Sequence, residues 1–599
     1  MVGHRLAGWL VPAGVAALAA VVFLPSLRNG FVSWDDSRMF QENPHHRGLG
    51  LAALYWSWTT FHLGEYMPVT WMTYGADYAL WGLDPFGYHL TNLGLHVLMS
   101  IAVYFVARRL LVYGAAGAGA SPVALSAAAG VAAVLFAVHP LRAEPVAWVS
   151  ARGSILGGLF AVLTVSAYLV GRARSSGDVV RREWYLASLG LFALALLSRS
   201  TNVMLPAVLL VLDVYPLRRL GRPPDGFFGP AARRVYGEKL PFLVLAGATV
   251  PLAILARIET EGVFGRQPVD PVAGAAVASF GLARYLGQTL LLTGLSSPLN
   301  EMPPRLDPTE WRFILAGALV FGITLWLVVM RRRCPAVLAG WVFYAVVLVP
   351  TLGVVPFGVQ LTADRYTYVS CLGWTVLAGA GWLAWWMRWR RGDVGRIPWA
   401  TSVILLVTLI GGLGALSWHR VDIWRDSKTL WRYTLSLEPR AVIAHQSLGL
   451  VLERDRHFVG AERHFRQAVE LRPHDATLRT NLGRTLARQG RLTEAVAELE
   501  TAVRLGPEFA DAYLTLGGAL AAQGRLEEAL EAYDRAARLR PESAAIHYNR
   551  AQALAGLRRF DEAVEHYQAA VRLVPDFAEA HANLALVLRR LKMRRERGT

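Results

Sequence analysis

Long apolar segments alternate with short basic or polar segments through the first two thirds of the chain. A transmembrane helix needs roughly 20 mostly apolar residues. Runs approaching this length occur near 7–26, 90–110, 122–140, 153–171, 184–198, 201–217, 239–257, 273–294, 313–330, 335–356, 369–388 and 399–418. Basic residues cluster where runs end, at 108–109, 172–182, 218–234, 331–333 and 388–391. Because cytoplasmic loops are rich in Lys and Arg, this pattern predicts a many-helix membrane domain over 1–419.

The basic clusters also predict a topology. If the N-terminus is cytoplasmic, the segments on the far side of the membrane are 27–89, 139–152, 199–200 and 357–368. Three apolar runs lie in 239–330 between two basic ends, and an odd number of crossings cannot place both ends in the cytoplasm. We therefore expect 273–294 to lie along the membrane or to re-enter it. About eleven crossings remain, which would place the residues after 419 on the far side.

A 34-residue period governs the rest of the chain. Proline recurs at this spacing, at Pro439, Pro473, Pro507, Pro541 and Pro575. Leu-Gly pairs and small alanine positions repeat with it, which is the pattern of the tetratricopeptide repeat (TPR). The sequence predicts a connector with a partial repeat over 420–441, then a TPR solenoid of four repeats and a capping helix over 442–592. The expected fold class is all-α: a polytopic helical membrane domain followed by an α-solenoid.

One position of each repeat carries a polar residue that could face the groove of the solenoid. These residues are Ser447, Asn481, Thr515, Asn549 and Asn583. TPR arrays bind peptides in a concave groove, and an asparagine amide offers a peptide backbone both a donor and an acceptor. The alternative is that Asn before Leu-Gly is a common feature of TPR sequences. The position therefore gives a hypothesis of an acceptor-peptide groove.

Composition and charge agree with a membrane protein. The chain has 599 residues, is 54% hydrophobic, contains 20 Trp and has a formal net charge of +17. The basic clusters explain this charge without nucleic acid, for which we find no binding motif. Two cysteines, Cys334 and Cys371, exclude a disulfide framework and a zinc site, and we expect no metal or other cofactor. Heavy use of Ala, Arg and Gly, with no eukaryotic retention signal at the end, favours a bacterial inner membrane with the TPR domain in the periplasm.

Acidic residues and arginines gather in the far-side segments. Asp35 and Asp36 follow the first apolar run directly. Paired carboxylates at a membrane boundary are costly and usually mark function, although a solvated, helix-capping acid is the alternative. Arg152 and Arg365 lie in two further far-side turns. A guanidinium near the interface suits bidentate binding of a lipid phosphate. The alternative for each arginine is a structural role, in which the side chain extends toward water or pairs with an acid.

Several motifs occur in a familiar order. They are Trp34-Asp35-Asp36, Tyr66-Met67-Pro68-Val69-Thr70, Gly82 to Asn92, the turn His139-Pro140…Glu144…Arg152, and Asp364-Arg365-Tyr366-Thr367-Tyr368. With the trailing repeats, they resemble the transmembrane and TPR repeat-containing (TMTC-like) family over nearly the whole chain. That family is similar to the GT-C glycosyltransferases, which include protein O-mannosyltransferases.

The resemblance implies a GT-C-like membrane fold and an activity. The donor would be a polyprenyl-phosphate-linked sugar, mannose or a similar hexose, and the acceptor Ser or Thr of an extracytoplasmic protein held by the TPR groove. Asp35 or Asp36 would be the catalytic base. Arg152 and Arg365 would neutralise the leaving phosphate, and the expected donor site also contains His139, Glu144 and Tyr366.

Two departures from the family pattern concern the donor site. Where relatives often have Lys-Glu, this chain has Arg199-Ser200, which keeps the cation and loses the acid. Where relatives often carry Arg or His, it has Met67. Either change would alter recognition of the donor head group or indicate a sugar other than mannose.

Two other classes of function compete with the enzyme. The chain could be a non-catalytic scaffold that recruits envelope proteins through its repeats, but an anchor needs only one helix. A transporter would show paired Gly- or Pro-broken helices or duplicated halves, which we do not find. The membrane glycosyltransferase is therefore the favoured hypothesis.

Overall fold

The structure is a computed structural model, and it describes residues 2–114, 119–172, 181–221, 226–261, 270–292, 295, 300–301, 307–352 and 360–597. The described chain forms two compact units, Met1–Leu430 and Trp431–Thr599. Helices make up nearly all of both units, so the predicted all-α class is confirmed. Parts of predicted segments fall outside the described residues, namely 173–180, 222–225, 293–294 and 353–359.

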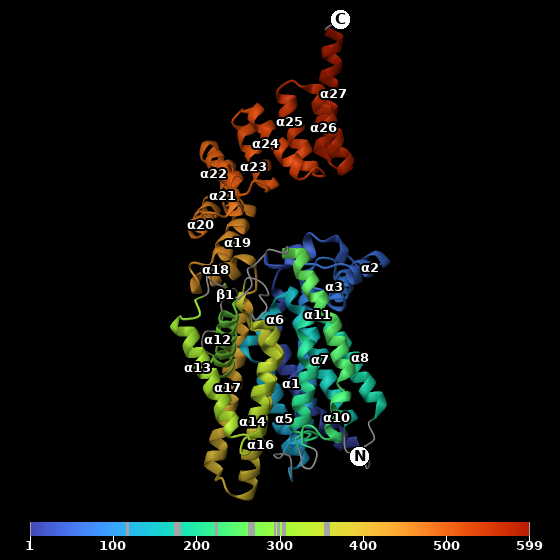
Figure 1. The fold of residues 1–599 in the computed structure, drawn as a ribbon, viewed down its shortest axis with the longest axis vertical. Coiled ribbons are helices and arrows are strands. Elements are labelled where there is room, and N and C mark those ends of the chain that lie inside the picture. Colours follow the sequence, from blue (N-terminus) through green and yellow to red (C-terminus); the bar gives the residue numbers. More distant parts are fainter. Residues whose placement is uncertain are drawn as a thin grey trace. The chain divides into compact units, whose positions relative to one another are not determined.

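The first unit is a bundle of helices that run lengthwise beside one another (Figure 1). Its helices are α1 (Val2–Phe23), α2 (Leu51–Thr59), α3 (Pro68–Trp81), α4 (Pro85–Tyr113), α5 (Pro122–Ala137), α6 (Ala143–Ala147), α7 (Arg152–Gly171), α8 (Arg182–Ser198), α9 (Leu205–Val214), α10 (Pro230–Gly237), α11 (Leu240–Glu261), α12 (Pro271–Leu290), α13 (Trp311–Val329), α14 (Pro335–Leu348), α15 (Thr367–Ser370), α16 (Leu372–Arg391) and α17 (Arg396–Asp422). Short 3-10 or π segments are η1 (Leu24–Arg28), η2 (Ser37–Gln41), η3 (Pro44–His46), η5 (Pro140–Arg142), η6 (Val149–Ala151), η7 (Ser200–Met204), η8 (Val349–Thr351) and η9 (Asp364–Tyr366).

Several helices are long and apolar enough to cross a membrane. Among the described residues they are Trp9–Arg28, Pro85–Tyr113, Val149–Gly171, Leu240–Glu259, Trp311–Val329 and Arg396–Asp422, and the bent pair α5 with Pro140–Ala147 would add one more. The chain is thus a multi-pass membrane protein. The predicted number of crossings is larger, about eleven, because several predicted runs form helices that are short or carry charge. Ser200–Val214 and Pro335–Thr351 are short apolar helices, and α16 ends in three arginines.

The predicted far-side segments meet at one end of the bundle, where α2, α3, α6 and β1 lie (Figure 1). A two-stranded antiparallel sheet joins one of these segments, 357–368, to the chain between α12 and α13. In it, β1 (Asn300–Glu301) pairs with β2 (Gln360–Thr362), with Asn300 opposite Thr362. Close helix packing leads into this end, since a Cβ on Gly157 of α7 would lie only 2.6 Å from Nδ2 of Asn202. Only glycine fits such an approach.

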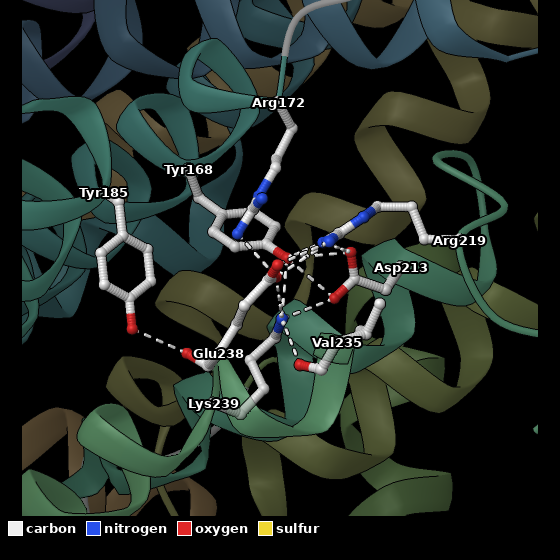
Figure 2. A network of polar contacts seen from close by, with 8 residues as sticks. All are labelled: Tyr168, Arg172, Tyr185, Asp213, Arg219, Val235, Glu238 and Lys239. Atoms are coloured by element: carbon white, nitrogen blue, oxygen red, sulfur yellow. Dashed lines mark hydrogen bonds and ion pairs between the residues drawn. The ribbon is translucent and has the colours of Figure 1, made fainter. Parts of the chain in front are cut away.

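A buried polar network joins α7, the end of α9 and the start of α11. Figure 2 shows the Tyr168 hydroxyl surrounded by Asp213, Arg219 and Lys239. Lys239 lies 2.7 Å from the Asp213 carboxylate, and both side chains are almost completely buried. Arg219 pairs with Asp213 and Glu238 at 2.9 Å, and Arg172 pairs with Glu238 at 2.6 Å. The network joins three helices through ion pairs between three cations and two carboxylates.

The second unit is the predicted solenoid of helix pairs. Its helices are α18 (Ser427–Leu437, which begins in the first unit), α19 (Val442–Arg454), α20 (Phe458–Leu471), α21 (Ala476–Arg488), α22 (Leu492–Leu505), α23 (Ala510–Ala522), α24 (Leu526–Leu539), α25 (Ala544–Gly556), α26 (Phe560–Leu573) and α27 (Ala578–Arg597). A Cβ on Gly449 would lie 2.7 Å from the Phe465 ring, and one on Gly483 or Gly517 would lie 2.5 Å from Leu499 or Tyr533. The repeated glycine therefore lets the large residue of the second helix pack against the first.

We expect Asp213→Asn to destabilise the first unit by about 3 kcal/mol, because it leaves the buried Lys239 ammonium without its nearest carboxylate. Thermal unfolding of the full chain in detergent would measure this loss. Arg233→Gln is the matched control, since Arg233 is exposed on nearby α10 and its loss should change stability by less than about 0.5 kcal/mol. Equal stability of the two variants would show that the network does not hold these helices.

Candidate active site

The carboxylate of Asp36 is held in place by hydrogen bonds from two segments. Its Oδ1 accepts from the backbone N–H of Ser150 at 3.1 Å and from the Ser150 hydroxyl, and its Oδ2 accepts from the backbone N–H of Val32 at 3.0 Å. The side chain is 1% exposed. Burial raises the pKa of Asp36 to about 7, although these hydrogen bonds oppose the shift. Asp36 therefore ties the first far-side loop to the turn before α7.

The carboxylate of Asp35 has different surroundings. Asp35 is half-buried, and its side chain makes no hydrogen bond or ion pair within the described part of the chain. Burial raises its pKa, and the nearby positive charge of Arg365 opposes that shift most strongly. Arg199 and Arg38 also lie within electrostatic range. Of the two adjacent acids, Asp35 is the one whose oxygens are free to meet a substrate.

Arg365 joins the far-side segments 139–152 and 357–368. It forms an ion pair with Glu144 at 2.5 Å, and its guanidinium lies over the rings of Trp148 and Tyr366, at 5.2 and 4.9 Å from their centres. Glu144 is 3% exposed. The structure thus brings together three of the predicted donor-site residues, Arg365, Glu144 and Tyr366, beside Asp35.

Arg152 and His139 have their own partners, none of which is Arg365, Glu144 or Tyr366. Arg152 is completely buried and pairs with Asp77 at 2.5 Å. It also donates to Asn92, to Thr73 and to the Tyr88 carbonyl, at 2.7, 3.1 and 3.0 Å. His139 accepts from the Leu141 N–H at 3.2 Å and contacts the Thr289 carbonyl at 3.1 Å. These contacts leave the Arg152 guanidinium no open side for a lipid phosphate.

Arg199 is a site residue that the prediction did not include. Its guanidinium is only loosely paired with Glu65, at 3.8 Å, and Glu65 in turn lies 3.7 Å from Arg257. A Cβ on Gly153 would lie 3.0 Å from Met67 Sδ and 3.6 Å from Arg199 Nη1. The two departures from the family pattern, at Met67 and at Arg199-Ser200, are therefore close together. The sequence feature that could have identified Arg199 is its position, where relatives often carry a lysine of the same charge.

A polar cavity next to Arg365 continues into an apolar one. The polar cavity is lined by Arg199, Arg365, Tyr366 and Tyr368, together with Ser154 and Thr351. It shares Thr201, Asn202, Val347 and Val369 with an apolar cavity between α4, α7, α9, α14 and α16. Along α4 the apolar lining runs from Val103 to Gly114, about 16 Å of helix. The site therefore offers a cationic end and a long apolar channel, which is the shape of an amphipathic ligand.

The connector that leads toward the solenoid is bonded to the loop that precedes Asp35. The Gly30 N–H donates to the Arg425 carbonyl at 2.9 Å, and the Ser33 N–H donates to the Ser427 hydroxyl at 2.8 Å. The indole of Trp424 stacks on that of Trp148 at 5.5 Å. At the end of α17, Arg420 pairs with Asp364 at 2.7 Å. Residues 420–427 thus contact all three loops that carry Asp35, Trp148 and Asp364.

The five predicted groove residues all lie on the first helix of a repeat or on α27. Asn481 accepts from Arg484 at 2.9 Å, Thr515 donates to the Asp511 carbonyl at 2.7 Å, and Asn583 donates to the Tyr548 hydroxyl at 2.9 Å. Ser447 and Asn549 are half-buried, and their side chains make no hydrogen bond in the described part of the solenoid. These two side chains are the ones open to a ligand.

Comparisons with known proteins agree with both units. Tetratricopeptide repeat models match residues 480–544 and 559–591. The chain is 26% identical over 467 residues to Protein O-mannosyl-transferase Tmtc3 of Drosophila melanogaster, covering 68% of this chain and 48% of that protein. It is 26% identical over 520 residues to human Protein O-mannosyl-transferase TMTC1, covering 77% and 55%, and 25% identical over 507 residues to mouse TMTC3, covering 76% and 50%. The chain spans about half the length of these curated relatives. The predicted resemblance to TMTC-like proteins is confirmed.

We expect the stability of the protein to fall as pH rises from about 4 to about 7, with Asp36 a main contributor. The pKa of Asp36 is raised from 3.8 to about 7 in the folded chain, so the folded state holds this proton more tightly and loses that advantage as pH rises to about 7. Thermal unfolding against pH would show a flatter profile for Asp36→Asn than for wild type. Asp393→Asn, at an exposed turn, should keep the wild-type slope. An unchanged slope in Asp36→Asn would contradict the assignment.

Proposed function

We propose that this protein is a membrane glycosyltransferase that moves a sugar, mannose or a similar hexose, from a polyprenyl-phosphate donor to Ser or Thr of an extracytoplasmic protein. The observation that carries the proposal is the Asp35 carboxylate, which makes no hydrogen bond or ion pair within the described chain and lies within electrostatic range of Arg365. Arg365 in turn lines a polar cavity that shares four lining residues with an apolar one. The printed names of the relatives, protein O-mannosyl-transferases, support transfer of mannose to protein.

The two cavities suit the two ends of a lipid-linked sugar. A polyprenyl chain is apolar and fits the channel between α4, α7, α9, α14 and α16. Its phosphate would lie in the polar cavity, where Arg199 and Arg365 can share the negative charge. We propose Arg199 for the role first predicted for Arg152, because the Arg152 guanidinium is occupied by Asp77 and Asn92.

The proposed reaction is a single inverting displacement. Asp35 accepts the proton of the acceptor hydroxyl while the hydroxyl oxygen bonds to the anomeric carbon. The bond between that carbon and the phosphate oxygen breaks, and its electron pair leaves with the polyprenyl phosphate. The two arginines stabilise the charge that develops on this leaving group. Glu144 and the rings of Trp148 and Tyr366 hold the Arg365 guanidinium in position.

The solenoid is proposed to hold the acceptor protein on the far side of the membrane. The bonds from Gly30 and Ser33 to Arg425 and Ser427 support this side, because they hold the last residues of the first unit next to the Asp35 loop. A bound acceptor raises the local concentration of hydroxyl groups at the site. The periplasmic face of a bacterial inner membrane is the location that we propose.

Replacing Asp35 tests the proposed base. Asp35→Asn should lower kcat for sugar transfer from polyprenyl-phosphate mannose to a Ser/Thr peptide at least about 100-fold, because no carboxylate then takes the proton. The KM for the donor should change less than about threefold, since Asp35 acts on the acceptor. Glu42→Gln, at an exposed acid in the same loop, should retain wild-type activity. Wild-type turnover by a folded Asp35→Asn variant would rule out this base.

Replacing an open groove residue tests the proposed role of the solenoid. Asn549→Ala should raise the KM for an acceptor protein about three- to tenfold and leave kcat unchanged, because it removes one pair of backbone contacts. Gln568→Ala is the matched control, since Gln568 is an exposed amide on the second helix of the same repeat. If both variants keep the wild-type KM, the solenoid does not hold the acceptor through this position.

A further inference from the structure

The turn between α16 and α17 combines many tryptophans with many arginines. It lies at the end of the bundle opposite to β1 (Figure 1). Four indoles of α16 recur at helical spacing, at Trp382, Trp385, Trp386 and Trp389, and Trp399 lies near the start of α17. Residues three, four and seven apart lie on one face of a helix. These four indoles therefore form a single row.

Trp399 packs into this row and holds the two helices in register. Its ring stacks on Trp389 at 4.5 Å and an interplanar angle of 9°, and it contacts Trp382 at 5.2 Å and Trp386 at 5.5 Å. Trp385 donates to the Ser402 hydroxyl at 3.0 Å. Gly392, with φ of 85°, closes α16, a conformation that favours glycine. The turn is thus a defined structure built on side-chain packing.

The arginines of this turn have no acidic partner. Arg388, Arg390, Arg391 and Arg396 are all exposed, and none forms an ion pair with a residue that the structure describes. Asp393 is the one acid between them, so the segment 388–396 carries a net charge of +3. A defined turn with uncompensated guanidinium groups next to a row of indoles needs a partner that is both anionic and partly apolar.

We propose that this turn binds the head groups of anionic phospholipids at the membrane surface. Indole rings favour the interface between head groups and acyl chains, and a guanidinium binds phosphate through two parallel N–H donors. Basic residues next to a membrane helix attract anionic lipid. The packed indoles would fix the depth and the spacing of the four arginines. The proposal concerns the opposite end of the bundle from Asp35 and does not depend on the proposed activity.

Lipid retention by the full chain tests this proposal. The protein is reconstituted in nanodiscs of phosphatidylcholine with a minor fraction of phosphatidylglycerol and then extracted with neutral detergent. Mass spectrometry measures the lipid that stays bound. Wild type should retain phosphatidylglycerol selectively, and changing the four arginines to Gln should reduce that retention at least about tenfold. Changing them to Lys should retain more than Gln but less than wild type, because the charge remains and the paired N–H donors are lost.

The matched control removes a second exposed basic cluster that has no row of indoles. Arg331, Arg332 and Arg333 lie in the turn between α13 and α14, and replacing all three by Gln should reduce retention less than about twofold. If both sets of Gln substitutions reduce phosphatidylglycerol retention equally, the proposal is wrong and the lipid is held by a general charge effect. Competition by inorganic phosphate would also overturn it, because the site would then recognise a free anion.

A measurement on wild type alone avoids any effect of the substitutions on folding. Brominated phosphatidylglycerol should quench tryptophan fluorescence more strongly than brominated phosphatidylcholine at the same mole fraction, because the indoles lie beside the bound head groups. Equal quenching by the two lipids would overturn the proposal.

Discussion

A charged side chain buried in a membrane protein needs an opposite charge beside it, because hydrocarbon offers no other solvation. In the first unit this requirement joins segments that are far apart in the sequence. Arg152 meets Asp77, Arg365 meets Glu144, and Lys239 meets Asp213, each at 2.7 Å or less. Removing one partner would leave the other charge uncompensated, so these pairs fix how the far-side loops and the opposite ends of the helices come together.

The same requirement explains why Asp35 stands out. Its neighbour Asp36 is buried and takes three hydrogen bonds, two of them from Ser150. Arg365, the strongest positive influence on Asp35, is already paired with Glu144. Asp35 is left half-buried, close to cations and without a hydrogen bond in the described chain. A partly buried carboxylate without a hydrogen bond lowers the stability of the fold. Carboxylates of this kind are typical of sites that act on a ligand.

The two ends of the bundle use arginine in different ways. At the Asp35 end, Arg365 is enclosed by Trp148, Tyr366 and Glu144, which hold its guanidinium against the polar cavity. At the other end, the arginines of the turn 388–396 are exposed beside packed indoles. An enclosed guanidinium has a fixed direction and suits one ligand at a site, whereas exposed ones suit the many head groups of a lipid surface.

The repeat period predicted the solenoid almost position by position, and the apolar runs predicted a helical membrane domain for the first unit. Repeat packing is local, so the 34-residue period predicted the helix pairs within which the structure packs Gly449 against Phe465 and Gly517 against Tyr533. The sequence also placed Asp35 and Asp36 together, next to the first apolar run. Only the tertiary structure decided which of the two acids is free, because Asp36 is bonded to Ser150, which is 114 positions away. In the same way it assigned Arg152 to Asp77 and Asn92 and brought Arg199 to the site. Pairing between distant polar groups depends on how the helices pack, and no periodic pattern along the chain encodes it.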